Sequence, residues 1–330
     1  MASLSDPVVV PTVEPQPQPQ PQMRAVLARL AQVRQGSPHR YSLPFAQARA
    51  QLLKERTPWL VDGPPCTSTD ISVRAEGREV GLRVTRPPHC RPDRLLVYLH
   101  GGGWCVGSPQ THDNIVRRLA TDLACEAWSV DYALAPEAVF PQGLLEVRSV
   151  IAQARRDHPE AQLTVAGDSA GANLALAAAL MELHAAGRPA MEALMLFYGV
   201  YDEGFDDASM QAFGDGQYGL SVQAQRRYAQ AYLGDTPSSG LERRCSFPLT
   251  SGVALKGLPP TWMAIAELDI LRDQNRRMAA QLKRSDVDVE VHEVPGVTHG
   301  FLSYGLMLDA AIQTLSAAAL WAQTQSLLKR

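Results

Sequence analysis

The sequence predicts an α/β fold in which a mostly parallel central sheet is covered by helices on both faces. Short apolar, β-branched runs with the length of buried strands alternate with segments of helical periodicity from residue 94 onward. The chain of 330 residues, 45% of them hydrophobic, is also long enough for one large α/β domain with an added segment.

Residues 1–22 differ in composition from the rest of the chain. Pro-Gln repeats run from Pro11 to Gln22, and we expect a disordered, polyproline-like tail because proline lacks an N–H and glutamine offers little to bury. Residues 23–65 follow as a helical segment, with amphipathic stretches over Met23–Val33 and Pro44–Arg56. This segment is interpreted as a cap over a site formed later in the chain. A helical extension on the back of the domain fits the pattern equally well.

The α/β domain is expected over residues 66–330. Its first two strands are predicted to be antiparallel and joined at Glu76-Gly77. The expected strands are Ser68–Arg74, Arg78–Arg86, Arg94–Leu99, Glu126–Asp131, a run from Leu163, Ala193–Phe197, Pro260–Ala266 and Val287–Val294. The expected helices are Asn114–Ala124, Gly143–Asp157, a run from Gly171 to Ala186, Ser221–Leu233, Asp273–Arg284 and Phe301–Leu328. Residues 198–220 lack a clear period and are predicted to form a long lid or pocket loop.

One serine stands between an expected strand and an expected helix. Gly167-Asp168-Ser169-Ala170-Gly171 has the G-x-S-x-G spacing of a nucleophile elbow, in which the chain turns too sharply for a Cβ on either side. Ser169 would then stand exposed at a helix N-terminus, and the Ala170 N–H would be placed to stabilise an oxyanion. A glycine-bounded turn, or a serine that only caps the helix, is the alternative interpretation.

Three glycines follow the expected strand that ends at Leu99. Consecutive glycines are entropically costly, so His100-Gly101-Gly102-Gly103-Trp104 suggests that another group approaches this backbone closely. The N–H groups of Gly102 and Gly103, with Gly101 as a third candidate, would complete an oxyanion hole beside Ala170. A flexible turn and an anion-binding nest are the alternative interpretations of this loop. A phosphate loop is excluded because neither G-x-G-x-x-G nor G-K-[ST] is present.

A serine nucleophile needs an imidazole base and a carboxylate that orients it, in the chain order Ser, Asp or Glu, His. Asp269 ends an expected strand and is the predicted acid, and His299 occupies the turn after another strand and is the predicted base. Glu267 is an alternative partner within the site, and Asp273 is predicted to cap a helix. His100 is expected to hold the glycine loop, and His292 lies within a strand. The other histidines have no triad context; they are His39, His89, His112, His158 and His184.

Four motifs together resemble the bacterial hormone-sensitive-lipase-like esterases, which have the α/β-hydrolase fold. They are His100–Trp104, Asp131–Glu137, Gly167–Gly171 and His299–Phe301, and the match runs from about Leu95 to the C-terminus. Tyr198-Gly199, Tyr228–Leu233 and His299–Tyr304 are most similar to the acetyl esterase branch. The resemblance implies a cofactor-free carboxylesterase acting on short acyl esters, with an N-terminal helical cap. The sequence departs from the family at Ala133, where arginine is usual, at Ile270, where proline is usual, and in its Pro-Gln tail.

The expected function is therefore hydrolysis of a small-molecule, short-chain acyl ester through an acyl-enzyme, carried by Ser169, Asp269 and His299 without cofactor or metal. The alternatives are a non-catalytic ligand-binding protein of this fold, which would lack the histidine, and an amidase that uses the same triad. Neither the substrate nor the oligomeric state can be predicted from the spacing of these residues. Dimerisation through an edge strand or outer helices is common in such folds, but no residue pattern here demands a homodimer.

Charge and composition exclude other partners. The net charge of −3 and the absence of a basic run predict no nucleic-acid binding, and no apolar run has membrane-spanning length. The first residues lack the pattern of a signal peptide. Five scattered cysteines without a C-x-x-C pair favour free thiols in a reducing cytoplasm.

Overall fold

The computed structural model describes residues 17–61, 63–235 and 239–327. Their strands form an eight-stranded sheet in the order β1-β2-β4-β3-β5-β6-β7-β8, in which β2 is antiparallel to both its neighbours, β1 and β4, and the strands from β4 to β8 in this order are parallel. The strands are β1 (Thr67–Ala75), β2 (Arg78–Arg86), β3 (Arg94–Leu99), β4 (Glu126–Asp131), β5 (Gln162–Asp168), β6 (Ala193–Phe197), β7 (Thr261–Leu268) and β8 (Val289–Thr298). The predicted fold class, the α/β-hydrolase fold with a mostly parallel sheet, is confirmed.

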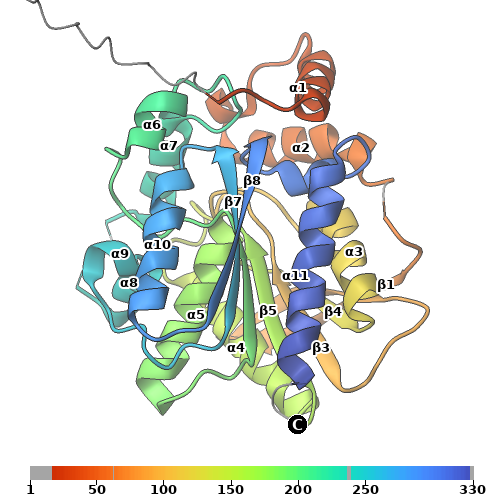
Figure 1. Cartoon of the computed structure of the whole chain (residues 1–330), viewed down its shortest axis with the longest axis vertical. Helices are drawn as coiled ribbons and strands as arrows, with labels where there is room; N and C mark the ends of the chain where they lie inside the picture. The colour runs from red at the N-terminus through yellow and green to blue at the C-terminus, as the bar shows by residue number, and fades with distance from the viewer. Residues whose placement is uncertain (1–16, 62, 236–238, 328–330) are drawn as a thin grey trace, which may run out of the picture.

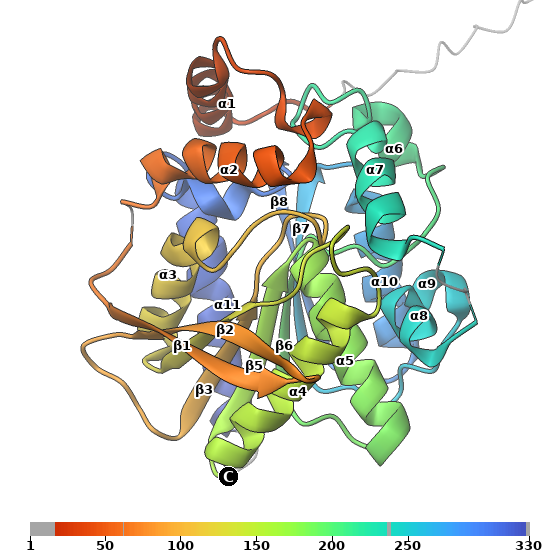
Figure 2. The same ribbon diagram turned by 180° about the vertical axis from the view of Figure 1, so that it is seen from behind.

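Helices cover both faces of the sheet, as Figure 1 and, from behind, Figure 2 show. One face carries α4 (Gln142–Asp157), α5 (Ala170–Ala186) and α10 (Arg272–Arg284), and the other carries α3 (Asp113–Leu123) and α11 (Asp309–Leu327). Neighbouring residues of one strand therefore enter opposite cores: Val97 of β3 packs on the first side and Tyr98 on the second. Burial on both faces explains why the central strands are continuous apolar runs without alternation.

Several of the remaining helices gather where the parallel strands end, beyond β7 and β8 in both views. They include α1 (Pro21–Arg34), the short η1 (Arg40–Ser42), α2 (Phe45–Arg56), η2 (Thr57–Trp59), α6 (Ala208–Phe213) and α7 (Val222–Leu233). The carboxyl edge of a parallel sheet is where ligands bind in such folds. These segments therefore surround the expected site.

The first helix begins at Pro21, two residues before the expected start at Met23. Proline suits the first helical position because its N–H would have no partner there. Gln22 donates to the Asp309 carboxylate and accepts from the Asp309 N–H, and the Gln20 N–H donates to Gly296 O at 2.9 Å. Residues 17–22 thus belong to the folded part of the chain, contrary to the predicted tail of 1–22. Residues 1–16 lie outside the described residues.

Three local predictions differ from the structure. The expected loop 198–220 contains α6, and the short helices α8 (Leu241–Ser246) and α9 (Pro248–Ser251) were not predicted. Strand β8 does not end at Val294 but continues to Thr298. It does so through a bulge in which Glu267 of β7 faces three residues of β8. The expected single helix over 301–328 is instead η4 (Phe301–Tyr304) followed by α11.

Candidate active site

Ser169 occupies the sharp turn between β5 and α5. Its backbone has φ +55° and ψ −118°, a strained conformation for a residue with a Cβ. A Cβ on Gly171 would lie 1.9 Å from Leu99 O, and one on Gly167 would lie 2.4 Å from the Gly171 carbonyl carbon. The two glycines therefore allow strand and helix to meet closely enough to present the serine at the sheet edge.

His299 and Asp269 reach Ser169 from the ends of two neighbouring strands, β8 and β7. His299 Nε2 lies 2.9 Å from Ser169 Oγ, and His299 Nδ1 lies 2.7 Å from Asp269 Oδ2. An ionised carboxylate only accepts hydrogen bonds, so Nδ1 carries the proton and Nε2 accepts from the serine hydroxyl. Asp269 is buried, and its other oxygen accepts from the Leu271 N–H at 2.9 Å. The arrangement has the connectivity of a nucleophile, base and orienting acid.

The glycine loop after β3 lies beside the serine and has backbone angles that favour glycine. Gly102 has φ +128° and Gly103 has φ +58°. A Cβ on Gly102 would lie 2.0 Å from Val106 O, and one on Gly103 would lie 2.4 Å from the Tyr228 ring. The loop therefore runs directly against α7 and its own following turn, with its backbone along the wall of the pocket that contains Ser169.

Gly101 differs from the expectation that its N–H is one of the candidate oxyanion donors. This N–H donates to Asp168 Oδ1 at 2.9 Å, so it is already engaged. Within the described part of the chain, no such bond is found for the N–H groups of Gly102, Gly103 or Ala170. The structure therefore leaves those three as the free donors.

Asp168, the residue before the nucleophile, has a structural role that the sequence did not reveal. Its buried carboxylate also accepts from Tyr98 Oη at 2.8 Å and lies 3.4 Å from His112 Nε2. Burial alone would raise the pKa of Asp168, but the charge and hydrogen bond of His112, with the bonds from Tyr98 and Gly101, lower it to about 2. The only available signal was its place inside the elbow, because Tyr98 and His112 lie far away in sequence.

His100 holds the glycine loop, as expected. Its Nδ1 lies 2.8 Å from Gly101 O, and its ring stacks on Tyr132 with 4.3 Å between ring centres. Burial, reinforced by the neighbouring charge of His112, lowers the pKa of His100 to about 3. The ring is therefore neutral at neutral pH. Tyr132 Oη in turn donates to His100 O at 2.7 Å.

The other acids near the triad have supporting roles. Glu267 does not touch the triad; its Oε2 accepts from the Gly296 N–H at 2.7 Å and so fixes the bulge that leads to His299. The prediction that Asp273 caps α10 is wrong, because Leu271 occupies that position. Asp273 lies in the first turn, and its carboxylate accepts from the Ser209 N–H at 2.7 Å.

His292 is an exposed residue of β8, and its ring stacks on Trp262.

An arginine from the N-terminal segment holds the stretch where the family arginine is missing. Ala133 donates its N–H to Glu146. Arg49 of α2 donates to Ala135 O at 2.9 Å, to Cys105 O at 2.8 Å and to both oxygens of Glu137. A cation on α2 thus ties the 135–137 segment and the oxyanion loop to the helix above them.

The pocket over Ser169 is small, with a volume of about 60 Å³. The carboxyl end of the sheet, η1, α2 and α7 all contribute to it. Its walls include Arg40, Tyr41, Leu52, Arg56, Gly101, Gly102, Gly103, Val106, His112, Asp168, Leu220, Gln225, Tyr228, His299 and Gly300. Residues 23–65 and 198–220 thus both reach the site.

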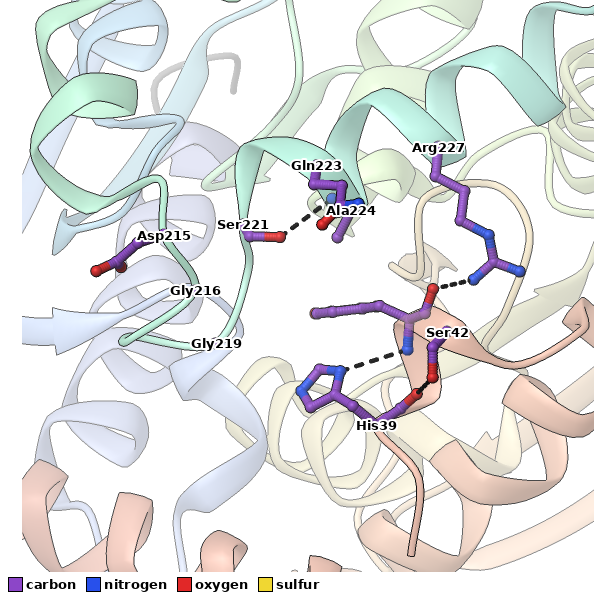
Figure 3. A pocket seen from close by; sticks show the side chains of 10 residues that line it. His39, Ser42, Asp215, Gly216, Gly219, Ser221, Gln223, Ala224 and Arg227 are labelled. Atoms are coloured by element: carbon purple, nitrogen blue, oxygen red, sulfur yellow. Dashed lines mark hydrogen bonds between the residues drawn. The ribbon is translucent and has the colours of Figure 1, made fainter.

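A larger pocket of about 460 Å³ lies beside it and shares Tyr41 as a wall (Figure 3). Its polar groups mostly bond to one another. Arg227 donates to Tyr41 O, His39 Nδ1 accepts from the Tyr41 N–H, and Ser221 caps α7. The Arg227 bond holds η1 against α7 at the rim of the site.

Metal and membrane features are absent from the part of the chain that the structure describes. There, no three His, Cys, Asp or Glu side chains gather as a metal cluster, and no helix has the length and apolarity to cross a bilayer.

Comparisons with known proteins agree with this geometry. A sequence profile of the α/β-hydrolase fold family matches residues 96–303. The chain is similar to an acetyl esterase of Salmonella schwarzengrund, with 33% identity over 279 residues, covering 82% of this chain and 84% of that protein. Among solved structures it is similar to a fungal esterase from Rhizomucor miehei, with a TM-score of 0.86, 28% identity and coverage of 96% of this chain and 100% of that one. It is also similar to an esterase of Pyrobaculum calidifontis, with a TM-score of 0.83, 26% identity and coverage of 93% and 99%.

Proposed function

The chain belongs to the α/β-hydrolase fold family, in its acetyl esterase branch, and is a serine carboxylesterase; we propose that Ser169 is its nucleophile, His299 its general base and Asp269 the acid that orients the base. The observation that carries this assignment is the hydrogen-bonded series from Ser169 Oγ to His299 Nε2, at 2.9 Å, and from His299 Nδ1 to Asp269, at 2.7 Å. No other histidine in the described residues bonds to the serine.

The proposed reaction is a two-step acyl transfer. Ser169 Oγ attacks the ester carbonyl as His299 takes its proton, and the resulting oxyanion accepts hydrogen bonds from the N–H groups of Gly102, Gly103 and Ala170. The tetrahedral intermediate collapses as His299 gives its proton to the leaving alcohol. Water then repeats both steps on the acyl-enzyme and releases the carboxylic acid and free enzyme. One oxyanion donor contributes about 3 kcal/mol to such a transition state.

The experiment that tests the nucleophile is covalent labelling. A fluorophosphonate should label the native chain at Ser169 and leave Ser169→Ala unlabelled, with turnover of p-nitrophenyl acetate lost and the circular dichroism spectrum kept. Turnover retained by Ser169→Ala, or a label on another serine, would contradict the assignment. Labelling also distinguishes an enzyme from a ligand-binding protein that merely keeps the fold.

Short acyl esters are the proposed substrates. A pocket of about 60 Å³ has room for a group the size of acetyl, since a cavity measured in the same way needs only about 10–15 Å³ to hold one water molecule. The similar Salmonella protein carries the name acetyl esterase. In a series of p-nitrophenyl esters, kcat/KM should peak at two to four acyl carbons; a peak at long chains would refute the proposal. Hydrolysis of p-nitroacetanilide at a comparable rate would favour the amidase alternative.

Residues 23–65 are proposed to act as a cap and 198–220 as a pocket loop. The supporting contacts are Leu52 and Tyr41 from the first segment and Leu220 from the second, all of which line the pocket of Ser169. Removing the cap by truncation at residue 65 should raise KM and broaden chain-length preference.

We place the protein in the cytoplasm, because all five cysteines are free thiols and three of them are buried. A homodimer is proposed through the unpaired edge of β8, the last strand of the sheet. Analytical ultracentrifugation tests the dimer, and a monomer at micromolar concentration would overturn it.

A further inference from the structure

The pocket over Ser169 contains a cation, Arg56, for which no ion pair is found among the described residues. Arg56 is the last residue of α2 and lines the pocket together with Ser169 and His299. Its guanidinium lies over the Tyr304 ring, 5.1 Å from the ring centre, and its Nη2 is 3.6 Å from the position that a Cβ on Gly300 would take. The charge is therefore held beside the residue that follows the catalytic base.

The Arg56 guanidinium is also short of hydrogen-bond partners. Nη1 is buried and has no partner within the described chain, and no ion pair of Arg56 is found there. A buried, unpaired N–H of a charged group costs free energy unless a ligand satisfies it. Arg56 is therefore suited to donate a hydrogen bond to an acceptor on a ligand.

The other charged side chains at the pocket all bond to partners, which makes Arg56 distinctive. Arg40 bonds to the buried Glu55, which also accepts from Arg34. On the opposite wall, Asp168 accepts from Tyr98 and Gly101, and Asp269 bonds to His299. The two arginines on Glu55 already exceed its single negative charge by one, and Arg56 adds a second unbalanced positive charge to the cap side of the pocket.

From this imbalance we propose that the enzyme selects esters that carry a carboxylate, which Arg56 binds. The inference rests on the proposed function and adds the substrate class. Because the proposed acyl group is short, the carboxylate is carried by the alcohol part of the ester. Arg56 lines the pocket and is partly exposed, so it can contact an alcohol part that extends out of the pocket. Acetyl esters of hydroxy acids fit both conditions. A guanidinium suits this task because it binds a carboxylate through two parallel hydrogen bonds.

The test compares two esters of matched shape, 3-acetoxybenzoate and 3-acetoxybenzamide, each corrected for its rate of alkaline hydrolysis. In the native enzyme, kcat/KM for 3-acetoxybenzoate should exceed that for 3-acetoxybenzamide by about tenfold or more, as expected for one charge-assisted pair. Arg56→Gln should bring the ratio to about one, mainly through KM of the anion, and Arg56→Lys should restore part of it. Raising the ionic strength should also lower the native ratio.

Lys54→Gln is the matched control, because it removes a positive charge from the exposed side of the same helix. Its ratio should equal that of the native enzyme. A native ratio near one, or a ratio that Arg56→Gln leaves unchanged, would overturn the inference while p-nitrophenyl acetate is still hydrolysed. Loss of turnover on every ester would instead contradict the proposed function.

Discussion

The Gly101 N–H donates to Asp168 Oδ1 at 2.9 Å and so connects the oxyanion loop to the residue before the nucleophile. The two residues lie 67 positions apart, at the ends of the neighbouring parallel strands β3 and β5. The bond positions the glycine loop relative to Ser169. An acceptor carboxylate inside the elbow therefore helps to shape the proposed oxyanion hole.

Asp168→Asn should weaken the fold in a pH-dependent manner. The folded-state pKa of Asp168, about 2, lies below its ordinary value of 3.8, so its ionised form stabilises the fold above about pH 4. This contribution, about 2 kcal/mol, is lost as the pH falls through 2. The difference in unfolding free energy between the native protein and the variant, measured by urea unfolding, should narrow between pH 4 and pH 2. The exposed Asp288→Asn is the control, and a difference independent of pH would contradict the account.

Asp269→Asn should keep the fold and lose most of the rate. The neutral amide no longer stabilises the imidazolium or holds the Nδ1 proton, and the corresponding change in a serine-protease triad costs about 10⁴-fold in kcat. Steady-state kinetics on p-nitrophenyl acetate measure the effect, with KM nearly constant. Asp273→Asn, four residues further on and bonded to Ser209 instead, should keep kcat within a few fold. A similar loss in both variants would mean that the effect is structural.

Gly103→Ala should damage the oxyanion hole. The added Cβ would lie 2.4 Å from Tyr228 Cγ and 2.9 Å from Tyr228 Cβ, atoms close to the backbone of α7 that cannot simply rotate away. The loop must shift, and displacing one oxyanion donor costs about 10² to 10³-fold in kcat. Gly77→Ala is a matched control, because Gly77 also has a positive φ, +74°, but an added Cβ there meets nothing within 4 Å. Equal activity in the two variants would show that Gly103 does not contribute to the oxyanion hole.

Arg49→Ala should loosen the contact between α2 and the oxyanion loop. The side chain makes hydrogen bonds to Cys105 O and Ala135 O, and both carbonyls would lose a charged donor. We expect a loss of about 1–3 kcal/mol in unfolding free energy, a higher KM and faster amide exchange in α2. Glu137→Gln removes only the exposed ion pair of Arg49 and should cost less than about 1 kcal/mol. Arg29→Ala, on the exposed side of α1, should change nothing.

Much of the fold follows from local pattern. The predicted bounds of β3, β4 and β6 coincide with the structure, because short, mostly buried segments of five or six residues between helical segments are typical of strands packed between two helical layers. The elbow was equally visible from its two glycines, and the structure requires both, since an added Cβ would lie 1.9 Å or 2.4 Å from backbone atoms around the turn. The predictions failed where short polar segments derive their structure from distant partners. Examples are α6, whose Ser209 is held by Asp273, and the β8 bulge, which is held by Glu267.

The sequence by itself determined the α/β class, and it predicted the position of the nucleophile and the order of its partners, because these depend on periodicity, on glycine sterics and on the chemistry of three side chains. Only the tertiary structure decided which N–H groups of the glycine loop remain free, since the acceptor for Gly101 lies at the end of another strand. It likewise decided the charge of the pocket, because Arg56 and Ser169 line the same pocket although they lie 113 positions apart, and no local pattern encodes such a distant neighbour.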